Sequence, residues 1–262
     1  MIAKIKEVCL NKGISIGMAT VDAQLKEFFQ KVRPCTTDHK LIRVGGEKDA
    51  GYLIPDDLEG IKTCFSPGVS LEAYFENDLS KRGIKSFLAD YSVEFPPIHN
   101  PLFSFEKKYL GMENDSMFMT LESWVNESLD VGNESDMILQ MDIEGGEYNV
   151  LIDTSNDLFK KFRIIIIEFH NLNFLFHQFG FQMISACFYK LLKNFQIVHI
   201  HPNNVSNPIH YKNYMTFPEM EFTFLRKDRI TTYEPNLSFP HELDRKNSEN
   251  KKDIVLPDCW YK

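Results

Sequence analysis

Between residues 61 and 225, short apolar runs alternate with amphipathic segments, and this alternation constrains the fold more than any other feature. The predicted strands are 61–66, 85–89, 137–141, 163–169, 195–200 and 221–225. Helices are predicted between them at about 71–82, 121–129, from 147 onward and at 174–193, the last interrupted near Gly180. Such alternation is typical of a mostly parallel sheet with helices on both faces. We therefore predict an α/β fold of the Rossmann-like, doubly wound kind.

The segments outside this core have patterns of their own. Residues 1–36 predict an N-terminal helical extension that packs on the core or forms a homo-oligomer contact. Residues 40–54 predict an added β-hairpin around a glycine-rich turn. Residues 236–262 are polar and predict a C-terminal tail on the surface. With 37–235 as the Rossmann-like core, the length of 262 residues fits one domain.

Charge and cysteine content narrow the setting and the partners. The formal net charge is −8, which argues against broad nucleic-acid binding because such binding needs clustered Lys and Arg. The five cysteines are scattered without metal-ligand spacing, so reduced thiols in the cytoplasm are expected. No apolar run is long enough for a signal peptide or a transmembrane segment, which agrees with a cytoplasmic protein.

Polar residues follow the predicted strands directly, where each strand ends. They occur at 66–70, at Asp90, and at 142–147, 168–171 and 201–204. Right-handed crossovers place the carboxyl ends of parallel strands at one edge of the sheet, which is where ligands bind in open sheets. The sequence therefore predicts a functional site at this edge.

Two of these positions are suited to a nucleoside-like ligand. Gly68 allows the backbone to approach a ligand closely, and the following helix start favours a carboxylate. Asp90 stands where an acidic side chain accepts ribose hydroxyls. The sequence lacks the GxGxxG and GxxxxGK[ST] patterns, which disfavours a dinucleotide or a nucleoside triphosphate. An ordinary tight turn at Gly68 and a surface loop at Asp90 are the alternatives.

The turn at 141–147, Met-Asp-Ile-Glu-Gly-Gly-Glu, is the most specific pattern in the chain. Three carboxylates beside two glycines at a strand–helix turn are hard to explain by packing alone. The alternative is a solvated acidic turn that caps a helix.

These motifs resemble those of FkbM-type methyltransferases. The turn at 141–147 is similar to the family signature K-I-D-x-E-G-x-E. One branch of the family has a further pattern, R-x-G-x-x-x-D-G-G-Y followed by S-x-G-V. The segments similar to that branch are 43–46, 49–52, 66–69, 75–83, 168–170 and 201–204. The resemblance covers about 40–228.

The resemblance implies a class I, S-adenosylmethionine-dependent O-methyltransferase that acts on a sugar, a glycan or a natural product. It implies cofactor contacts at one set of positions: Ser66, Gly68, Val69, Ser70, Asp90 and Asp142. Ala50 and Pro67 depart from the branch pattern, because Ala50 replaces a usual glycine and Pro67 lies inside the cofactor loop.

A methyl acceptor must lose a proton, and histidine is the commonest base near neutral pH. We predict His170 as the base, with Asp142 or Glu168 orienting it. A satisfied buried histidine is the alternative. In a second version, Asp142, Glu168 and His170 bind a divalent metal such as magnesium, which lowers the proton affinity of the acceptor oxygens.

Acceptor binding is predicted for Glu144 and for the His201, Asn203 and Asn204 cluster, in which His199 also lies. A loop held by asparagine hydrogen bonds is the alternative for that cluster. A non-sugar small molecule or a phosphate derivative also fits as acceptor. A nucleotide-binding oxidoreductase on the same fold and a non-catalytic binding module are the competing functions.

Overall fold

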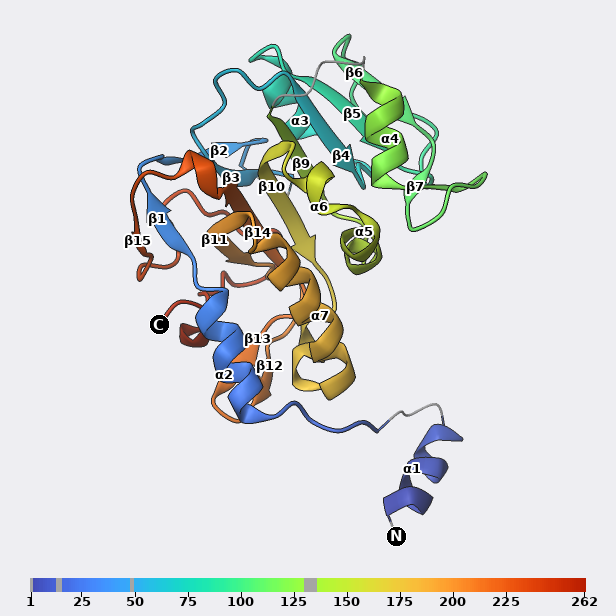
Figure 1. The fold of residues 1–262 in the computed structure, drawn as a ribbon, viewed down its shortest axis with the longest axis vertical. Helices are drawn as coiled ribbons and strands as arrows, with labels where there is room; N and C mark the ends of the chain where they lie inside the picture. The colour runs from blue at the N-terminus through green and yellow to red at the C-terminus, as the bar shows by residue number, and fades with distance from the viewer. Residues whose placement is uncertain (1, 13–15, 48–49, 130–135) are drawn as a thin grey trace.

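The computed structural model describes residues 2–12, 16–47, 50–129 and 136–262. Its centre is a seven-stranded sheet in the order β11-β14-β10-β9-β4-β5-β6 (Figure 1). The strands are β4 (Thr63–Pro67), β5 (Lys85–Ala89), β6 (Phe103–Glu106), β9 (Met137–Met141), β10 (Phe162–Phe169), β11 (Phe195–Pro202) and β14 (Met220–Arg226). Strand β14 is antiparallel to both neighbours and the other adjacent pairs are parallel. The fold is thus the predicted mostly parallel, Rossmann-like α/β fold.

The remaining elements surround this sheet. The α-helices are α1 (Ile2–Leu10), α2 (Asp22–Lys31), α3 (Tyr74–Ser80), α4 (Leu121–Ser128), α5 (Glu147–Asp153), α6 (Asn156–Phe159) and α7 (Gln178–Leu191). Short strands pair as β1 (Cys35–Thr37) with β15 (Tyr233–Pro235), β2 (Leu41–Val44) with β3 (Tyr52–Pro55), β7 (Tyr109–Leu110) with β8 (Phe118–Met119), and β12 (Ile209–Tyr211) with β13 (Tyr214–Thr216). The β2–β3 pair is the predicted hairpin. Three 3-10 turns occupy Leu172–Phe176, Lys227–Arg229 and Asp258–Trp260.

Both faces of the sheet are buried. Helices α2, α4, α5 and α7 cover one face, where Trp124 lies edge-on to Phe65 with ring centroids 5.0 Å apart. Helix α3 and the β2–β3 hairpin cover the other, where Tyr52 packs against Phe75. Every residue of the inner strand β10 is buried, which suits its run of β-branched isoleucines. The core therefore lies on the two sides of β10, β9 and β4.

The structure corrects two predicted helix boundaries and adds a strand. Helix α3 begins at Tyr74 rather than about 71, because Ser70 has φ 46° and its N–H binds Asp90. The predicted helix at 174–193 breaks at His177 rather than near Gly180. Gly180 lies inside α7, where a Cβ would come within 2.5 Å of the Phe174 Cβ. Residues 91–118, which carry no predicted strand, contribute β6 at the sheet edge.

The C-terminal tail is not the predicted surface extension. Leu256, Trp260 and Tyr261 are buried in the core, and Trp260 lies edge-on to Phe29 of α2 at 4.8 Å. The Trp260 indole donates a hydrogen bond to the Met215 carbonyl at 3.2 Å. Apolar residues spaced within a polar segment thus anchor the tail.

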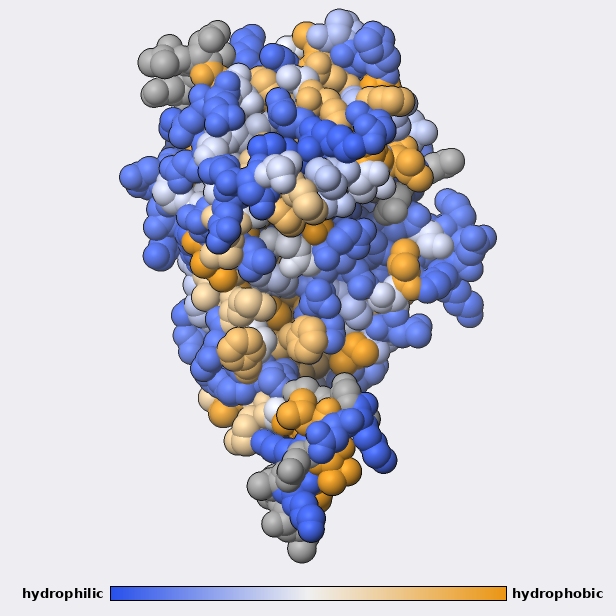
Figure 2. All heavy atoms as spheres, turned by 90° about the vertical axis from the view of Figure 1, so that its right-hand side faces the viewer, coloured by the Kyte–Doolittle hydropathy of each residue, from blue (hydrophilic) through white to orange (hydrophobic). Residues whose placement is uncertain are grey.

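The two N-terminal helices differ in their packing. Leu25, Phe28 and Phe29 of α2 are buried, whereas Ile5, Val8 and Leu10 of α1 are about half exposed or more. Helix α1 stands away from the rest of the chain in Figure 1, and Figure 2 shows apolar side chains on it at the lower end of the molecule. Of the two expectations for residues 1–36, packing on the core therefore holds for α2 but not for the described residues of α1. None of the described helices is both long and apolar enough to span a bilayer.

Candidate active site

Three loops meet where β4, β5 and β9 end. The Gly68 N–H donates to the Ala89 carbonyl at 2.9 Å, and the Asp142 N–H donates to the Pro67 carbonyl at 3.3 Å. These bonds extend the parallel ladder by one residue beyond the strands. They bring Gly68, Asp90 and Asp142 together at the edge where open sheets bind ligands.

Gly68 is required by this close approach. Its φ is +90°, and a Cβ at this position would lie 1.6 Å from the Asp142 carbonyl oxygen. Any other residue would both strain the backbone and clash with β9. The glycine therefore allows the first loop to pass directly over the start of the acidic turn.

Asp90 fastens the loops after β4 and β5 to each other. Its Oδ2 accepts the Ser70 N–H at 2.8 Å, and its Oδ1 accepts the N–H and the hydroxyl of Ser92, each at 2.7 Å. The residue is only 5% exposed. An ionised carboxylate has about four acceptor positions, so three bonds leave room for one more.

Two adjoining cavities follow these loops, and they share Gly68, Ser70, Asp142 and Glu144. One, of about 470 Å³, lies beside Asp90 and has an apolar wall of Leu110, Ile143, Tyr109 and Phe118. The other, of about 300 Å³, is lined by Val69 and, on its polar side, by Tyr52, Glu76 and Gln140. The two cavities form one cleft with an aromatic end and a polar end, which we call the strand-end cleft.

A buried chain of hydrogen bonds supports the polar end. Burial raises the pKa of Glu76, and its carboxylate Oε1 is in hydrogen-bond contact with the Ser66 hydroxyl. Ser66 donates to Gln140 Oε1 at 2.6 Å, and Gln140 Nε2 donates to the Tyr52 hydroxyl at 3.1 Å. Ser66 is fully buried, so its hydroxyl belongs to this chain.

The acidic turn after β9 is shaped around Glu147. This side chain is fully buried, and its Oε1 accepts the N–H groups of Ile143 at 3.2 Å and Gly145 at 3.0 Å. Glu144 and Gly145 both have positive φ, which tightens the turn. The same oxygen lies 3.1 Å from His170 Nδ1. Glu147, rather than the predicted Asp142 or Glu168, therefore makes the hydrogen-bond contact with His170 Nδ1.

Three carboxylates surround the His170 ring. Its Nε2 lies 3.8 Å from Asp142 Oδ1 and 3.5 Å from Glu144 Oε2, opposite the contact with Glu147. Burial lowers the pKa of His170, but the hydrogen bond to Glu147 and the nearby carboxylate charges outweigh it and raise the pKa to about 9. Burial raises the pKa of Asp142 to about 7, against the opposing charge of His170. At neutral pH the imidazole is therefore a cation beside a carboxyl that titrates.

The other predicted residues lie in a separate group, between the sheet and the tail. Glu168 is buried and its Oε1 accepts the Asn203 amide at 2.8 Å. Asn204 binds the backbone of Ser248 and Lys252, and His201 lies 3.6 Å from Asp244. The predicted metal set of Asp142, Glu168 and His170 is not brought together, because Glu168 faces Asn203. Glu144 takes its place beside Asp142 and His170.

Sequence reasoning did not assign several contributors to the strand-end cleft, among them Glu147, Tyr109 and Phe118. Glu147 is the last residue of the recognised acidic turn, so its position in the motif was a usable signal. Tyr109 and Phe118 lie on the short strands β7 and β8 within residues read as irregular. Asp49 of the hairpin motif lies outside the described residues.

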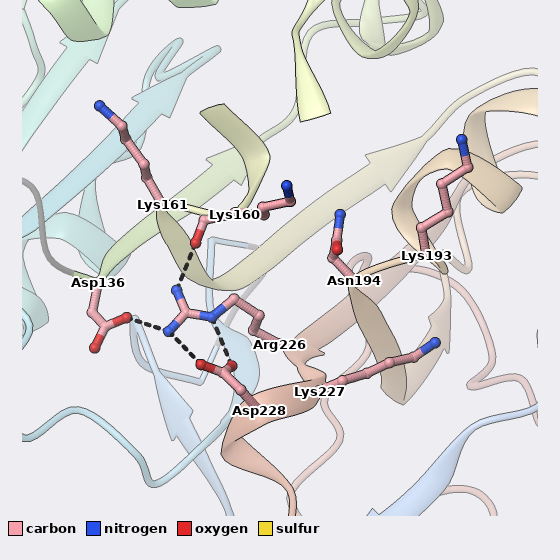
Figure 3. Close-up of a pocket in the computed structure, with 8 residues that line it drawn as sticks. All are labelled: Asp136, Lys160, Lys161, Lys193, Asn194, Arg226, Lys227 and Asp228. Atoms are coloured by element: carbon pink, nitrogen blue, oxygen red, sulfur yellow. Dashed lines mark hydrogen bonds and ion pairs between the residues drawn. The ribbon is translucent and has the colours of Figure 1, made fainter. Parts of the chain in front are cut away.

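A further hollow, of about 550 Å³, lies at the opposite edge of the sheet (Figure 3). Asp136 precedes β9, and Lys160 and Lys161 precede β10, so this is the edge where strands begin. The Arg226 guanidinium is held by Asp136 at 2.6 Å and by Asp228 at 2.7 Å. The lysine ammonium groups point apart in Figure 3 rather than toward a common point. We therefore interpret this hollow as a structural feature of the edge where the parallel strands begin, and not as a ligand site.

Comparison with known proteins supports the reading of the motifs. The chain is similar in structure to a chain of a fibrillarin/Nop5p complex, at TM-score 0.39 and 8% identity, over 64% of this chain and 74% of that one. No match to the chain is found among curated proteins. The family model described as the methyltransferase FkbM domain matches residues 119–227, which confirms the resemblance seen in the sequence. Residues 119–227 are therefore similar to the FkbM methyltransferase domain.

Proposed function

We propose that the protein is an S-adenosylmethionine-dependent O-methyltransferase that acts on a hydroxyl of a sugar or glycan. The observation that carries the proposal is the meeting of Gly68, Asp90, Asp142 and His170 at the strand-end cleft. These residues lie up to about a hundred positions apart in the sequence, yet their loops are bonded to one another. The FkbM methyltransferase match contains Asp142 and His170.

Three features of the cleft fit the cofactor. Gly68 forms a cradle that any Cβ would fill. Asp142 Oδ1 is buried without a hydrogen-bond partner among the described residues, as expected of an atom that awaits a ligand. Tyr109 and Phe118 offer an apolar wall for an adenine ring beside Asp90. When bound, the cofactor supplies an activated methyl group on a sulfonium cation, which suits an acidic edge.

Each cofactor contact has a distinct role in this proposal. Asp90 uses its remaining acceptor position for a ribose hydroxyl. Gly68, Val69 and Ser70 hold the amino-acid end against the backbone of the first loop. Ser66 supports the cofactor site indirectly. Its buried hydroxyl holds the loop after β4 through hydrogen bonds with Glu76 and Gln140.

Asp142, rather than His170, takes the acceptor proton. A histidine whose pKa is about 9 is already protonated at neutral pH and has no free lone pair for a proton. Asp142 titrates near neutrality, which is where a general base works best. His170 then serves as a fixed cation that holds Asp142 and Glu144 in place, with Glu147 behind it.

The acceptor enters past Glu144. Its side chain is 89% exposed and lies at the mouth of the cleft, where it can accept hydrogen bonds from sugar hydroxyls. Predicted acceptor contacts at His201, Asn203 and Asn204 stay a proposal. Within the chain, Asn203 donates to Glu168 and Asn204 donates to the backbone of Ser248 in the tail.

In a second version of the proposal, a bound magnesium ion assists removal of the acceptor proton. Asp142, Glu144 and His170 place one potential ligand atom each within 4.8 Å of the others. Such an ion would supply a Lewis acid for the acceptor oxygen. Exhaustive chelation of the protein distinguishes the versions, because turnover survives it only when no metal is needed.

The test of the function is transfer of a labelled methyl group from S-adenosylmethionine to a panel of acceptors. The panel contains monosaccharides, nucleotide sugars, glycans, and non-sugar alcohols and phosphates as controls. We expect label on a sugar hydroxyl, and loss of transfer in Asp142→Asn. Label only on a non-sugar control would overturn the acceptor class, while hydride exchange with NAD and no methyl transfer would identify an oxidoreductase instead.

We also propose a reducing, cytoplasmic setting and a single domain with core 37–235. All five cysteines are free, and three of them are buried. Cys64 and Cys187 lie on opposite faces of the sheet, in separate parts of the core. A disulfide-free protein of this kind is typical of reducing compartments. Mass spectrometry of the unreduced protein should find five thiols.

A further inference from the structure

A second group of potential metal ligands lies away from the strand-end cleft. His199 and His201 of β11 face Asp244 of the C-terminal tail, and one ligand atom from each lies within 4.8 Å of the others. All three side chains are nearly buried, with exposures of 4%, 7% and 6%. We call this group the tail cluster.

The two imidazoles of the tail cluster have too few hydrogen-bond partners among the described residues. His199 Nε2 binds Asp244 Oδ1 at 2.8 Å, and the other carboxylate oxygen accepts the His241 N–H at 2.8 Å. His201 Nδ1 lies 3.6 Å from the same Oδ1, too far for a hydrogen bond. Both ring nitrogens of His201 are buried without a partner among the described residues. Buried polar atoms in that state are costly and call for a missing partner.

The spacing of the ligand atoms fits a cation. Ligands about 2.1 Å from a tetrahedral zinc ion lie roughly 3.4 Å apart. The two imidazole–carboxylate separations, 2.8 Å and 3.6 Å, lie on either side of that value. Two imidazoles and one carboxylate on a rigid strand and an adjacent loop form a ligand set that zinc accepts.

We propose that His199, His201 and Asp244 bind a zinc-type divalent cation that fixes residues 236–262 to β11. The ion would satisfy the nitrogen of His201 that faces Asp244. Leu256 and Trp260 already anchor the C-terminal end of this segment in the core. The ion would attach its N-terminal part to the sheet through Asp244. The role of the ion is structural, because all three side chains are nearly buried and Phe239 stacks against His199.

The surroundings of the tail cluster suit a positive ion. Glu221 of β14 lies directly opposite His201 in the sheet register and binds Asn247 of the tail at 2.7 Å. Arg245, which follows Asp244, turns outward to pair with Glu47. The Glu221 carboxylate therefore adds negative charge beside His201, and the Arg43 guanidinium also interacts with Glu221 and Asp244.

Calorimetric titration of the full chain, stripped with chelator, with zinc ions alone tests the proposal. We expect one tight equivalent that remains in His170→Ala and weakens at least about 100-fold in His201→Gln, because even outer contacts of metal ligands are worth 10- to 100-fold. Asp244→Asn, which keeps the shape of the side chain, should weaken binding similarly. His170→Ala is the matched control, since that histidine belongs to the other potential cation group.

Two results would overturn the site. One is a wild-type protein that binds no zinc, and the other is zinc binding lost in His170→Ala but kept in His201→Gln. Anomalous scattering from wild-type crystals at the zinc edge gives an answer independent of whether the variants fold. A peak between the two imidazoles and Asp244 supports the proposal, and a peak elsewhere or none contradicts it.

Discussion

At the scale of single residues, the chemistry depends on how burial and nearby charges set the pKa values of Asp142 and His170. Asp142 and Glu144 both lie near His170 Nε2, at 3.8 Å and 3.5 Å, and Glu147 lies beside the other ring nitrogen. Four ionisable groups in so small a space must titrate together. Sequence reasoning found three of them but assigned the base to His170, because the pKa of a histidine is set by neighbours that the sequence does not place.

Asp142→Asn should reduce kcat by about 10²- to 10⁴-fold, the usual worth of a positioned general base. The amide has the same shape, so folding and cofactor affinity should change little. In the wild type, kcat/KM should rise with pH as Asp142 ionises near 7 and fall as His170 loses its proton near 9. Rates measured across this range check both statements, and an unchanged kcat in the variant would remove Asp142 from the mechanism.

His170→Gln should move the acid limb of that profile to higher pH. The cation of His170 lowers the pKa of Asp142, so its loss leaves burial and the charges of Glu144 and Glu147 unopposed. A purely structural role for His170 would lower the rate at every pH without moving the limb. The pH profiles of wild type and variant, fitted together, separate the two roles.

At the scale of elements, the pattern of apolar runs was sufficient for the sheet. The predicted bounds of β5 and β9 agree with the structure, because each mostly apolar run is followed directly by an aspartate. The edge strand β6 and the short strands β7 and β8 escaped prediction, since partly exposed strands have weak periodicity. For the same reason the aromatic wall of the cleft could not be predicted.

Gly68→Ala tests the loop approach that forms the cleft. The variant combines positive-φ strain with a clash against the Asp142 carbonyl. Gly83→Ala is the matched control, because Gly83 has φ +75° and open space around its Cβ position. We expect Gly83→Ala to lose about 1 kcal/mol of unfolding free energy and Gly68→Ala clearly more, from strain costs of roughly 1–3 kcal/mol. Denaturant unfolding gives both values, and equal losses would contradict the clash.

At the scale of the whole molecule, the two termini behave oppositely. The tail closes the core through Leu256 and Trp260, whereas α1 leaves its apolar residues exposed. Neither outcome follows from composition. A mostly polar segment can still contain a few buried apolar residues, and a short amphipathic helix can pack against another molecule instead of its own core. A nine-residue helix is marginal alone in water, so α1 is expected to be covered by a second copy of the chain.

Deletion of residues 1–12 should therefore convert a homo-oligomer into a monomer without lowering the melting temperature of the core. Ile5, Val8 and Leu10 are the apolar residues that such a contact would cover. Light scattering of the full chain and the deletion variant measures the masses. A full chain that is monomeric at high concentration would contradict the oligomer contact.

The most direct test of the account is calorimetric titration of the wild-type protein with S-adenosylhomocysteine, with NAD as the comparison ligand. The strand-end cleft predicts one equivalent bound, with affinity reduced in Asp90→Ala and retained in Asp142→Asn. NAD should give no heat of binding. Binding of NAD without binding of S-adenosylhomocysteine, or an affinity that Asp90→Ala leaves unchanged, would contradict the assignment of this cleft to the methyl donor.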